Sequence, residues 1–342
     1  MTLTRRSALA LAAAGMALAA LPAAAQTTNL RVHTGNPGAS TFTYTTTFQT
    51  IAQRELPVRF NVTSGMTSTR STLDAARGQV DLYISSPAIN YYMANGSAMF
   101  AEVADAAKLF ENVRGMINFP LGPYHVITYA DSGIESLQDI KGKRVFAGPP
   151  GGAATVVGLA IVKGATGFTE DVDYQLAKLD WTAGNQAFQD RQVDVAIIPT
   201  ELPSASIQQF ALLSQIRFLD LPAEALESEA MQRVLSVPGR TMEQIPPGIY
   251  GPNQVNTEPV NVVGSWVGIG VNKDLDEQLV YDLTRITFEH LDEFHAAADW
   301  MKTITLETAL ANFNAPLHPG ALRFYREQGV EIPDALIPPE AR

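Results

Sequence analysis

The sequence predicts an α/β protein built from two similar lobes, and three observations support this prediction. Segments with strand and helix patterns alternate along the chain in two successive series. A related sequence occurs once in each series, as "QVDLYISSP" (79–87) and "QVDVAIIP" (192–199). Two extended segments, 124–131 and 260–268, are long enough to cross between the lobes. Strands that alternate with helices indicate a parallel sheet in each lobe.

The first series ends near residue 96. Gly78 is a helix stop signal and Pro87 is a favourable first residue of a helix. The expected strands are 29–35, 57–65 and 79–86, and the expected helices are 41–56, 67–78 and 87–96.

The second series follows the first extended segment. Its expected strands are 143–148, 172–180, 193–200 and 215–222, and its expected helices are 151–167, 182–192 and 202–213. The segment 259–272 is expected to be extended, and a helical tail begins with a helix over 274–298. We therefore expect lobe I to comprise 26–126 plus 264–342, and lobe II to comprise 127–263.

The first 25 residues have the pattern of a signal peptide. Arg5 and Arg6 precede an apolar, alanine-rich run, and a small-residue cleavage signal ends at Ala25. We expect export by the Sec route, with Tat as the alternative that Thr4-Arg5-Arg6 suggests, and cleavage after Ala25. Removal of the leader leaves 22 basic and 35 acidic residues, a net charge of −13.

This charge balance argues against nucleic acid as a partner, because the chain has no basic stripe to displace counterions from phosphates. It does not exclude an anionic small molecule, because local donors outweigh screened surface charge. The chain has no cysteine, so thiol catalysis, cysteine-based metal sites and disulfides are excluded. We expect no cofactor and no metal.

The loops that follow the expected strands are the best candidates for a ligand site. Sheets of this kind bind ligands beyond the carboxyl ends of their strands. If the two lobes face each other, five such loops line one cleft: 35–41, 63–67, 85–87, 148–155 and 199–203.

The most conspicuous of these loops is "GPPGGAAT" (148–155). It lacks the spacing of a dinucleotide fingerprint and the lysine of a phosphate loop. The amide groups that begin the following helix could still bind a carboxylate or phosphate. An ordinary strand-to-helix turn is the alternative.

From these strand ends we expect a set of ligand contacts in which hydroxyl groups and backbone amides predominate. The expected contacts are Gly38, Ala39, Ser40, Thr41, Phe42, Thr63, Ser64, Gly65, Met66, Ser85, Ser86, Tyr124, Pro150, Gly151, Gly152, Ala153, Ala154, Thr155, Thr200 and Glu201. Capping and turn formation are the alternative roles of the serines and threonines. Trp181 is a further aromatic side chain that could pack on a ligand.

Glu201 is the most informative charge among these residues. At a strand end that faces the cleft, it would repel a plain carboxylate and favour a ligand with an amine. The alternative is an exposed loop carboxylate. Arg114 could pair with an anionic ligand.

Signals for catalysis are poor. The motif "GSWVG" (264–268) has its serine one position too early for a nucleophile elbow. His290 and His295 are five residues apart and do not share a helix face for a metal. His318, before Pro319, is expected to begin a helix. We expect no catalytic residue.

Several segments together resemble the TAXI-type solute-binding receptors of tripartite (TRAP) transporters. They are "LQDIKGKRVFAGPPGGAAT" (137–155), "QVDLYISS" and "LHPGALRFYREQGVEIP" (317–333). The resemblance implies a type II-like, two-lobe periplasmic binding protein fold with two hinge crossings and a helical C-terminal tail. It also implies a monomer that captures a small solute in the periplasm and delivers it to the TRAP membrane subunit.

The best-understood members of that family favour glutamate, glutamine or related organic acids. Here "TGNPGASTF" (34–42) has Thr41-Phe42 where the family usually has tyrosines. The resemblance therefore bears on the transport role more than on the ligand. The alternatives are a binding protein of an ABC importer or a sensor system, and an exported hydrolase.

Overall fold

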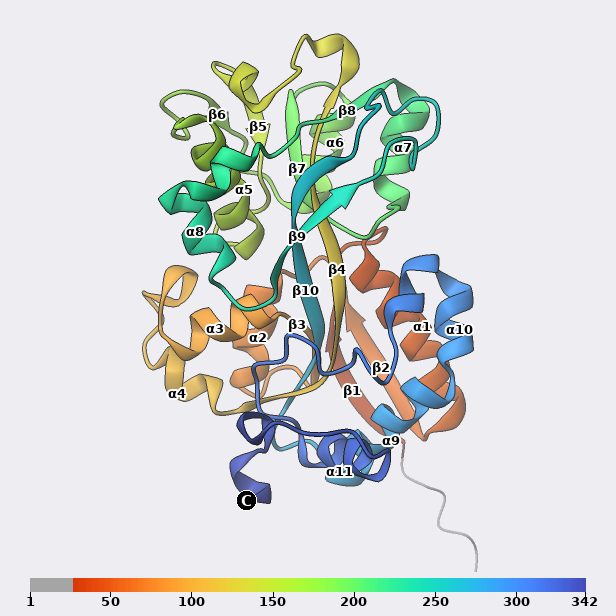
Figure 1. The fold of residues 1–342 in the computed structure, drawn as a ribbon. Coiled ribbons are helices and arrows are strands. Elements are labelled where there is room, and N and C mark those ends of the chain that lie inside the picture. Colours follow the sequence, from red (N-terminus) through yellow and green to blue (C-terminus); the bar gives the residue numbers. More distant parts are fainter. Residues whose placement is uncertain (1–26) are drawn as a thin grey trace, which may run out of the picture.

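A computed structural model describes residues 27–342, and the predicted signal peptide lies outside the described residues. The helices and strands form two lobes that are joined by two long strands (Figure 1). These joining strands are β4 (Val113–Tyr129) and β10 (Val260–Asn272). The predicted two-lobe α/β fold is confirmed.

Lobe I contains the first series of strands and helices together with the C-terminal helices (Figure 1). Its own strands are β1 (Thr28–His33), β2 (Val58–Thr63) and β3 (Leu82–Ser85). Its helices are α1 (Ser40–Glu55), α2 (Ser68–Ala76), α3 (Pro87–Ala94), α4 (Ala106–Phe110), α9 (Glu277–Glu289), α10 (Leu291–Ala297) and α11 (Pro319–Glu327). β1 pairs in parallel with both β2 and β3, as predicted.

Lobe II contains the second series. Its strands are β5 (Arg144–Phe146), β6 (Gln175–Leu176), β7 (Val195–Pro199), β8 (Ile216–Phe218) and β9 (Arg240–Ile245). Its helices are α5 (Ala153–Thr166), α6 (Trp181–Gln189), α7 (Ala205–Leu213) and α8 (Glu229–Leu235). β5 pairs in parallel with β6 and β7, whereas β7 and β8 run antiparallel to β4.

The two joining strands pair with each other and give a sheet path of β2-β1-β3-β10-β4-β7-β5-β6. Their antiparallel pairing extends from Gly264 opposite Pro123 to Asn272 opposite Val113. The first half of β10 also pairs with β9. The predicted crossing segments lie on these two strands. The predicted lobe boundaries fall inside them and stay predictions.

Each lobe has its own hydrophobic core. In lobe I, the buried ring of Tyr44 stacks on Phe119 and Phe294, with centroid distances of 4.7 and 5.2 Å. In lobe II, Tyr129 stacks on Phe188 at 4.8 Å. Burial of such rings is the main favourable contribution to folding. The two lobes are therefore separately packed bodies on either side of the joining strands.

The structure differs from the sequence prediction in several elements. The helix expected over 274–298 breaks at His290, which leaves helical geometry (φ −116°, ψ 27°) and separates α9 from α10. The strand expected over 172–180 is reduced to β6. Strand β9 and helices α4 and α8 were not predicted. In β9 the half-buried positions hold polar residues and Met242 is exposed, so its sequence lacks a hydrophobic alternation. His318 begins α11, as expected.

Candidate functional site

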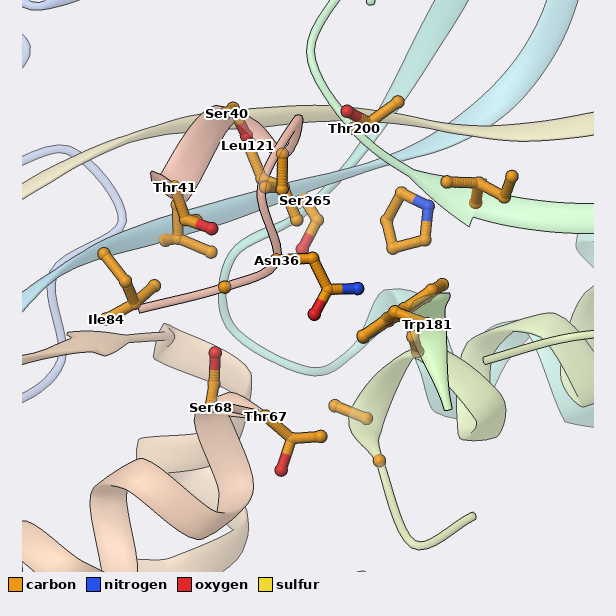
Figure 2. Close-up of a pocket in the computed structure, with 18 of the residues that line it drawn as sticks. Asn36, Ser40, Thr41, Thr67, Ser68, Ile84, Leu121, Trp181, Thr200 and Ser265 are labelled. Carbon is orange, nitrogen blue, oxygen red and sulfur yellow. The ribbon is translucent and has the colours of Figure 1, made fainter. Parts of the chain in front are cut away.

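A cavity of about 160 Å³ lies between the lobes and is lined by loops from both of them. Lobe I contributes the loop before α1, the loop before α2 and the start of α3. Lobe II contributes the starts of α5 and α6, the end of β7 and Arg240 of β9. Figure 2 shows Ile84 and Trp181 on opposite sides of the view, with Asn36 between them. The expected cleft at facing strand ends is thus present.

Three helices begin at this cavity without a side-chain cap. Their N-cap residues are Ala39 for α1, Ser86 for α3 and Gly152 for α5, and all three line the cavity. The first N–H groups of a helix have no intrahelical partner and carry partial positive charge. At α1, the Ser40 amide already faces the Glu201 carboxylate of lobe II. The starts of α3 and α5 have no such partner among the described side chains, so their donors are available to a ligand.

Among the described residues that line the cavity, Arg240 is the one with a charged side chain. Its Nη1 donates to the hydroxyl of Ser265 at 2.6 Å and to that of Tyr124 at 3.3 Å. Both hydroxyl-bearing residues are buried and lie on the joining strands β10 and β4. No ion pair formed within residues 27–342 includes Arg240.

The backbone around Arg240 is held by close packing. Gly239 has a φ of +77°, and a Cβ built there would lie 2.9 Å from the ring of Pro87 at the start of α3. The carbonyl of Gly239 also accepts a hydrogen bond from the amide of Trp266. Glycine at this position therefore permits the close approach of lobe I that places Arg240 at the cavity.

Three buried polar atoms of cavity-lining residues have no hydrogen-bond partner within the described chain. They are Ser40 Oγ, Thr69 Oγ1 and Asn185 Oδ1. Buried polar atoms are nearly always paired, so such atoms at a cavity indicate places where a ligand or water supplies the missing bond. Ser40 and Thr69 belong to lobe I and Asn185 to lobe II.

The rest of the lining combines polar residues such as Asn36, Thr67 and Ser68 with an apolar surface. A β-bulge in β4 leaves Leu121 without an opposite residue on β10, because Ser265 pairs with Gly122 whereas Trp266 pairs with Pro120. Such bulges redirect a side chain locally, and Leu121 lines the cavity. Trp181 is fixed by an edge-to-face contact with Phe146 at 5.5 Å. The other large apolar residues of the lining are Met66, Ile84, Ile89, Ile198 and Val267.

More than half of the residues expected from the sequence line this cavity. They are Gly38, Ala39, Ser40, Thr41, Met66, Ser86, Tyr124, Gly152, Ala153, Ala154 and Thr200. The other expected residues do not line it: Phe42, Thr63, Ser64, Gly65, Ser85, Pro150, Gly151, Thr155 and Glu201. Ligand contact by the residues of either group stays a prediction.

Local structure explains several of these differences. The hydroxyl of Thr155 donates to the carbonyl of Pro149 at 2.6 Å and thereby stabilises its own loop. Pro150 and Gly151 form the exposed tip of that loop, and Ser64 and Gly65 are exposed between β2 and α2. Ser86, and not Ser85, lines the cavity, because successive residues of a strand face opposite sides.

Glu201 is buried, which contradicts the alternative of an exposed loop carboxylate. Burial raises the pKa of its carboxyl, although the hydroxyl of Thr200 and the backbone amides of Ser40 and Ala205 oppose that rise. The carboxylate is thus engaged by protein donors instead of lining the cavity. Arg114 is also engaged elsewhere, with its Nε 2.8 Å from the Glu340 carboxylate.

Several cavity-lining residues were not among the expected ligand contacts. They are Gly35, Asn36, Pro37, Thr67, Ser68, Thr69, Ile84, Ile89, Leu121, Pro149, Asn185, Ile198, Pro199, Ser206, Arg240, Ser265 and Val267. Most are close in sequence to expected contacts. Arg240, Ser265 and Leu121 are different, because β9 was not predicted and, apart from Tyr124, no contact was expected from the joining strands. Trp181, which the sequence indicated could pack on a ligand, also lines the cavity.

The described residues contain no group of three or more histidine and acidic side chains suited to a metal. His125, next to the cavity residue Tyr124, is fully buried, and its Nε2 lies 2.7 Å from the hydroxyl of Tyr250. Burial lowers the pKa of His125 to about 4. Within residues 27–342, no helix has the length and apolar character needed to cross a bilayer.

Solved structures of low sequence identity match most of the length of this chain. One is the periplasmic aliphatic sulphonate-binding protein of Escherichia coli, with 12% identity over 87% of this chain and 78% of that chain and a TM-score of 0.44. The sugar acid-binding protein of Advenella mimigardefordensis, solved with galactonate, has 11% identity over 90% and 86% and a TM-score of 0.46. A marine metagenome TRAP solute-binding protein, solved with 3-hydroxybenzoate, has 12% identity over 90% and 84% and a TM-score of 0.45.

A family model provides the assignment. The model of the NMT1-like family matches residues 32–329, which include both lobes and the residues that line the cavity. The chain belongs to the NMT1-like family.

Proposed function

We propose that this protein is an extracytoplasmic solute-binding protein of a TAXI-type TRAP transporter. It captures a small organic acid or amino acid, such as a glutamate- or glutamine-like solute or another carboxylate, and delivers it to a membrane permease. The observation that carries the proposal is the cavity between the lobes, with the uncapped starts of α3 in lobe I and α5 in lobe II and one arginine at its wall. Catalysis has no role in this proposal.

Binding would be coupled to closure of the lobes. A ligand that contacts Ser40 in lobe I and Ala153 in lobe II adds favourable contacts only when the lobes are close together, so it shifts the population toward the closed state. The two joining strands are the elements about which the lobes would move. Closure also removes the ligand from water, and this strengthens its interactions with the amide donors.

The signal-peptide pattern of residues 1–25 supports a location outside the cytoplasm, and we propose the periplasm. The TAXI assignment rests on the sequence segments around residues 137–155 and 317–333. An ABC importer or a sensor system could use the same kind of cavity. The proposals for ligand capture and for the membrane partner therefore need separate tests.

The first test is a thermal-shift screen of the purified chain without its leader against carboxylates, dicarboxylates and amino acids. We expect one class of compound to raise the melting temperature and to reduce the radius of gyration in small-angle scattering. A chain that responds to none of them, or that turns over model esters and amides, would contradict the proposal. Uptake into vesicles with the candidate permease, driven by a sodium gradient or by ATP, then distinguishes TRAP from ABC transport.

A further inference from the structure

We infer that the solute carries a single anionic group on a compact apolar body and has no ammonium group, and that Arg240 binds the anion. This inference rests on the proposed role in solute capture and narrows the solute class. It departs from the amino acids that the TAXI resemblance suggests. Four features of the described chain lead to it.

The first feature is the charge of the cavity wall. Among the described residues that line it, Arg240 is the side chain that is charged at neutral pH, and no carboxylate joins it. A ligand ammonium group would therefore enter a partly buried site without an acidic partner, which is strongly unfavourable. Glu201, which directly follows the lining residue Thr200, could have paired with an ammonium group, but its carboxylate already interacts with Thr200 and with backbone amides.

The second feature is the orientation of Arg240. A guanidinium has five N–H donors, and the hydrogen bonds to Ser265 and Tyr124 both use Nη1. The side chain is half-buried and has no acidic partner within the described chain. A guanidinium that is held in place by two hydroxyls and still has free donors is suited to a carboxylate or a similar planar anion.

The third feature is the apolar part of the wall. Ile84, Leu121 and Trp181 present aliphatic and aromatic surface to the same cavity as Arg240. Trp181 packs edge-to-face on Phe146, and the absence of a side chain at Gly148 makes room for the indole, since a built Cβ there would lie 3.2 Å from it. A second carboxylate, such as that of glutamate, would find no second cationic side chain among the described residues of this wall, where only neutral hydroxyl and amide groups accompany the apolar surface.

The fourth feature is the size of the cavity. Its volume is about 160 Å³. An engineered apolar cavity of about 150 Å³ is large enough to bind benzene. A single ring or a short alkyl chain therefore fits within the space, with its anionic group toward Arg240.

Matched probes test the inference on the unmodified protein by calorimetry. Phenylacetate has the proposed features, 2-phenylacetamide lacks the charge, and L-phenylglycine adds an ammonium group to the same skeleton. Hexanoate tests an aliphatic body, and L-glutamate and L-glutamine represent the amino acid alternative. We expect phenylacetate or hexanoate to bind at least about tenfold more tightly than the amide and the amino acids, because a charge-assisted hydrogen bond is lost or an ammonium is left unpaired.

The outcomes distinguish this inference from the proposed function. Tighter binding of an amino acid than of every monoanionic probe overturns the inference and leaves solute capture intact. The absence of binding by every probe, together with a negative broader screen, overturns both. Equal affinity for phenylacetate and its amide removes the role of the anion.

Variants then test Arg240 itself. We expect Arg240→Gln to weaken the binding of phenylacetate at least about tenfold and to change the affinity for 2-phenylacetamide less than twofold. The affinity of Arg240→Lys for phenylacetate should lie between those of the unmodified protein and of Arg240→Gln. Arg233→Gln is the matched control, because Arg233 is exposed on α8 and pairs with Glu229. If Arg240→Gln binds phenylacetate and 2-phenylacetamide more weakly by the same factor, Arg240 has a merely structural role. If that variant fails to fold, the probe series on the unmodified protein still tests the inference.

Discussion

Glu201 and Ser40 face each other across the boundary between the lobes, with the carboxylate of one directed at the backbone amide that begins α1 in the other. Glu201 precedes α7 in lobe II, and the amide of Ala205 faces the same carboxylate. A buried carboxylate at two helix starts is favoured by the local partial charges but opposed by its loss of hydration.

The substitution Glu201→Gln should change how stability depends on pH. Burial raises the pKa of Glu201 in the folded protein above its ordinary value. The stability that this group contributes is therefore fully present below the unfolded pKa and is lost as the pH rises through the folded pKa. The unmodified protein should lose this contribution as the pH rises, whereas Glu201→Gln has no such group to titrate. We therefore expect the free energy of unfolding of Glu201→Gln, minus that of the unmodified protein, to increase between pH 4.5 and 7. Urea unfolding at several pH values measures this, and a constant difference would contradict it.

His125 should contribute in the opposite direction. Its pKa is lowered by burial to about 4, below the ordinary value of 6.5, so the unfolded chain binds the proton more readily. The free energy of unfolding therefore falls as the pH decreases from 6.5 toward 4, by about 3 kcal/mol once the titration is complete. His125→Gln keeps a polar amide near Tyr250 and should flatten this part of the profile in urea unfolding. An unchanged slope would show that His125 is not the group that titrates.

Gly122 is predicted to be intolerant of a side chain. It lies in β4 with a φ of +112°, and a built Cβ would overlap the backbone oxygen of Thr200 and lie 2.9 Å from Cα of Glu201. We expect Gly122→Ala to reduce the free energy of unfolding by about 3 kcal/mol or more. Gly142→Ala is the control, because Gly142 has a φ of +73° and open space around it. It should cost about 1 kcal/mol. Similar losses for both would contradict the role assigned to close packing.

The start of α5 offers a variant in which stability and affinity should change in opposite directions. Ala154→Asp places a negative charge in the first turn of α5, at the wall of the cavity. We expect the helix to gain about 0.5 kcal/mol and an anionic ligand to lose at least about tenfold in affinity. Gln278→Glu adds the same charge to the first turn of α9, outside the cavity lining, and should leave affinity unchanged. Thermal unfolding and calorimetry measure the two effects, and unchanged affinity in Ala154→Asp would place the anion elsewhere.

The sequence predicted most of the fold because local patterns determine most of it. Alternation of strands and helices, Gly78 as a stop signal and Pro87 as a start signal lead directly to the observed order of elements. Two regions escaped prediction for physical reasons. β9 is partly exposed and is held by its pairing with β10, which is not a local property. The break at His290 separates two segments that each have a helical pattern.

The sequence predicted the cavity-lining residues that follow the ends of strands, and it missed those that reach the cavity through contacts between distant segments. Ser40, Ser86 and Gly152 follow from the rule that ligands bind beyond the carboxyl ends of strands. Arg240 reaches the cavity because Gly239 packs on Pro87, more than 150 residues away in the sequence, as the numbering shows. Glu201 occupies a strand end, but its carboxylate is held by protein donors and not at the cavity surface.

The bulge at Leu121 has a consequence for how such a protein can evolve. Leu121 and Ser265 are part of the paired strands that join the lobes, and they also form part of the cavity wall. A replacement there alters both the surface of the cavity and the angle between the two lobes. Diversification toward new solutes is therefore expected to proceed through loop residues such as Asn36 and Met66, while the paired strands change slowly.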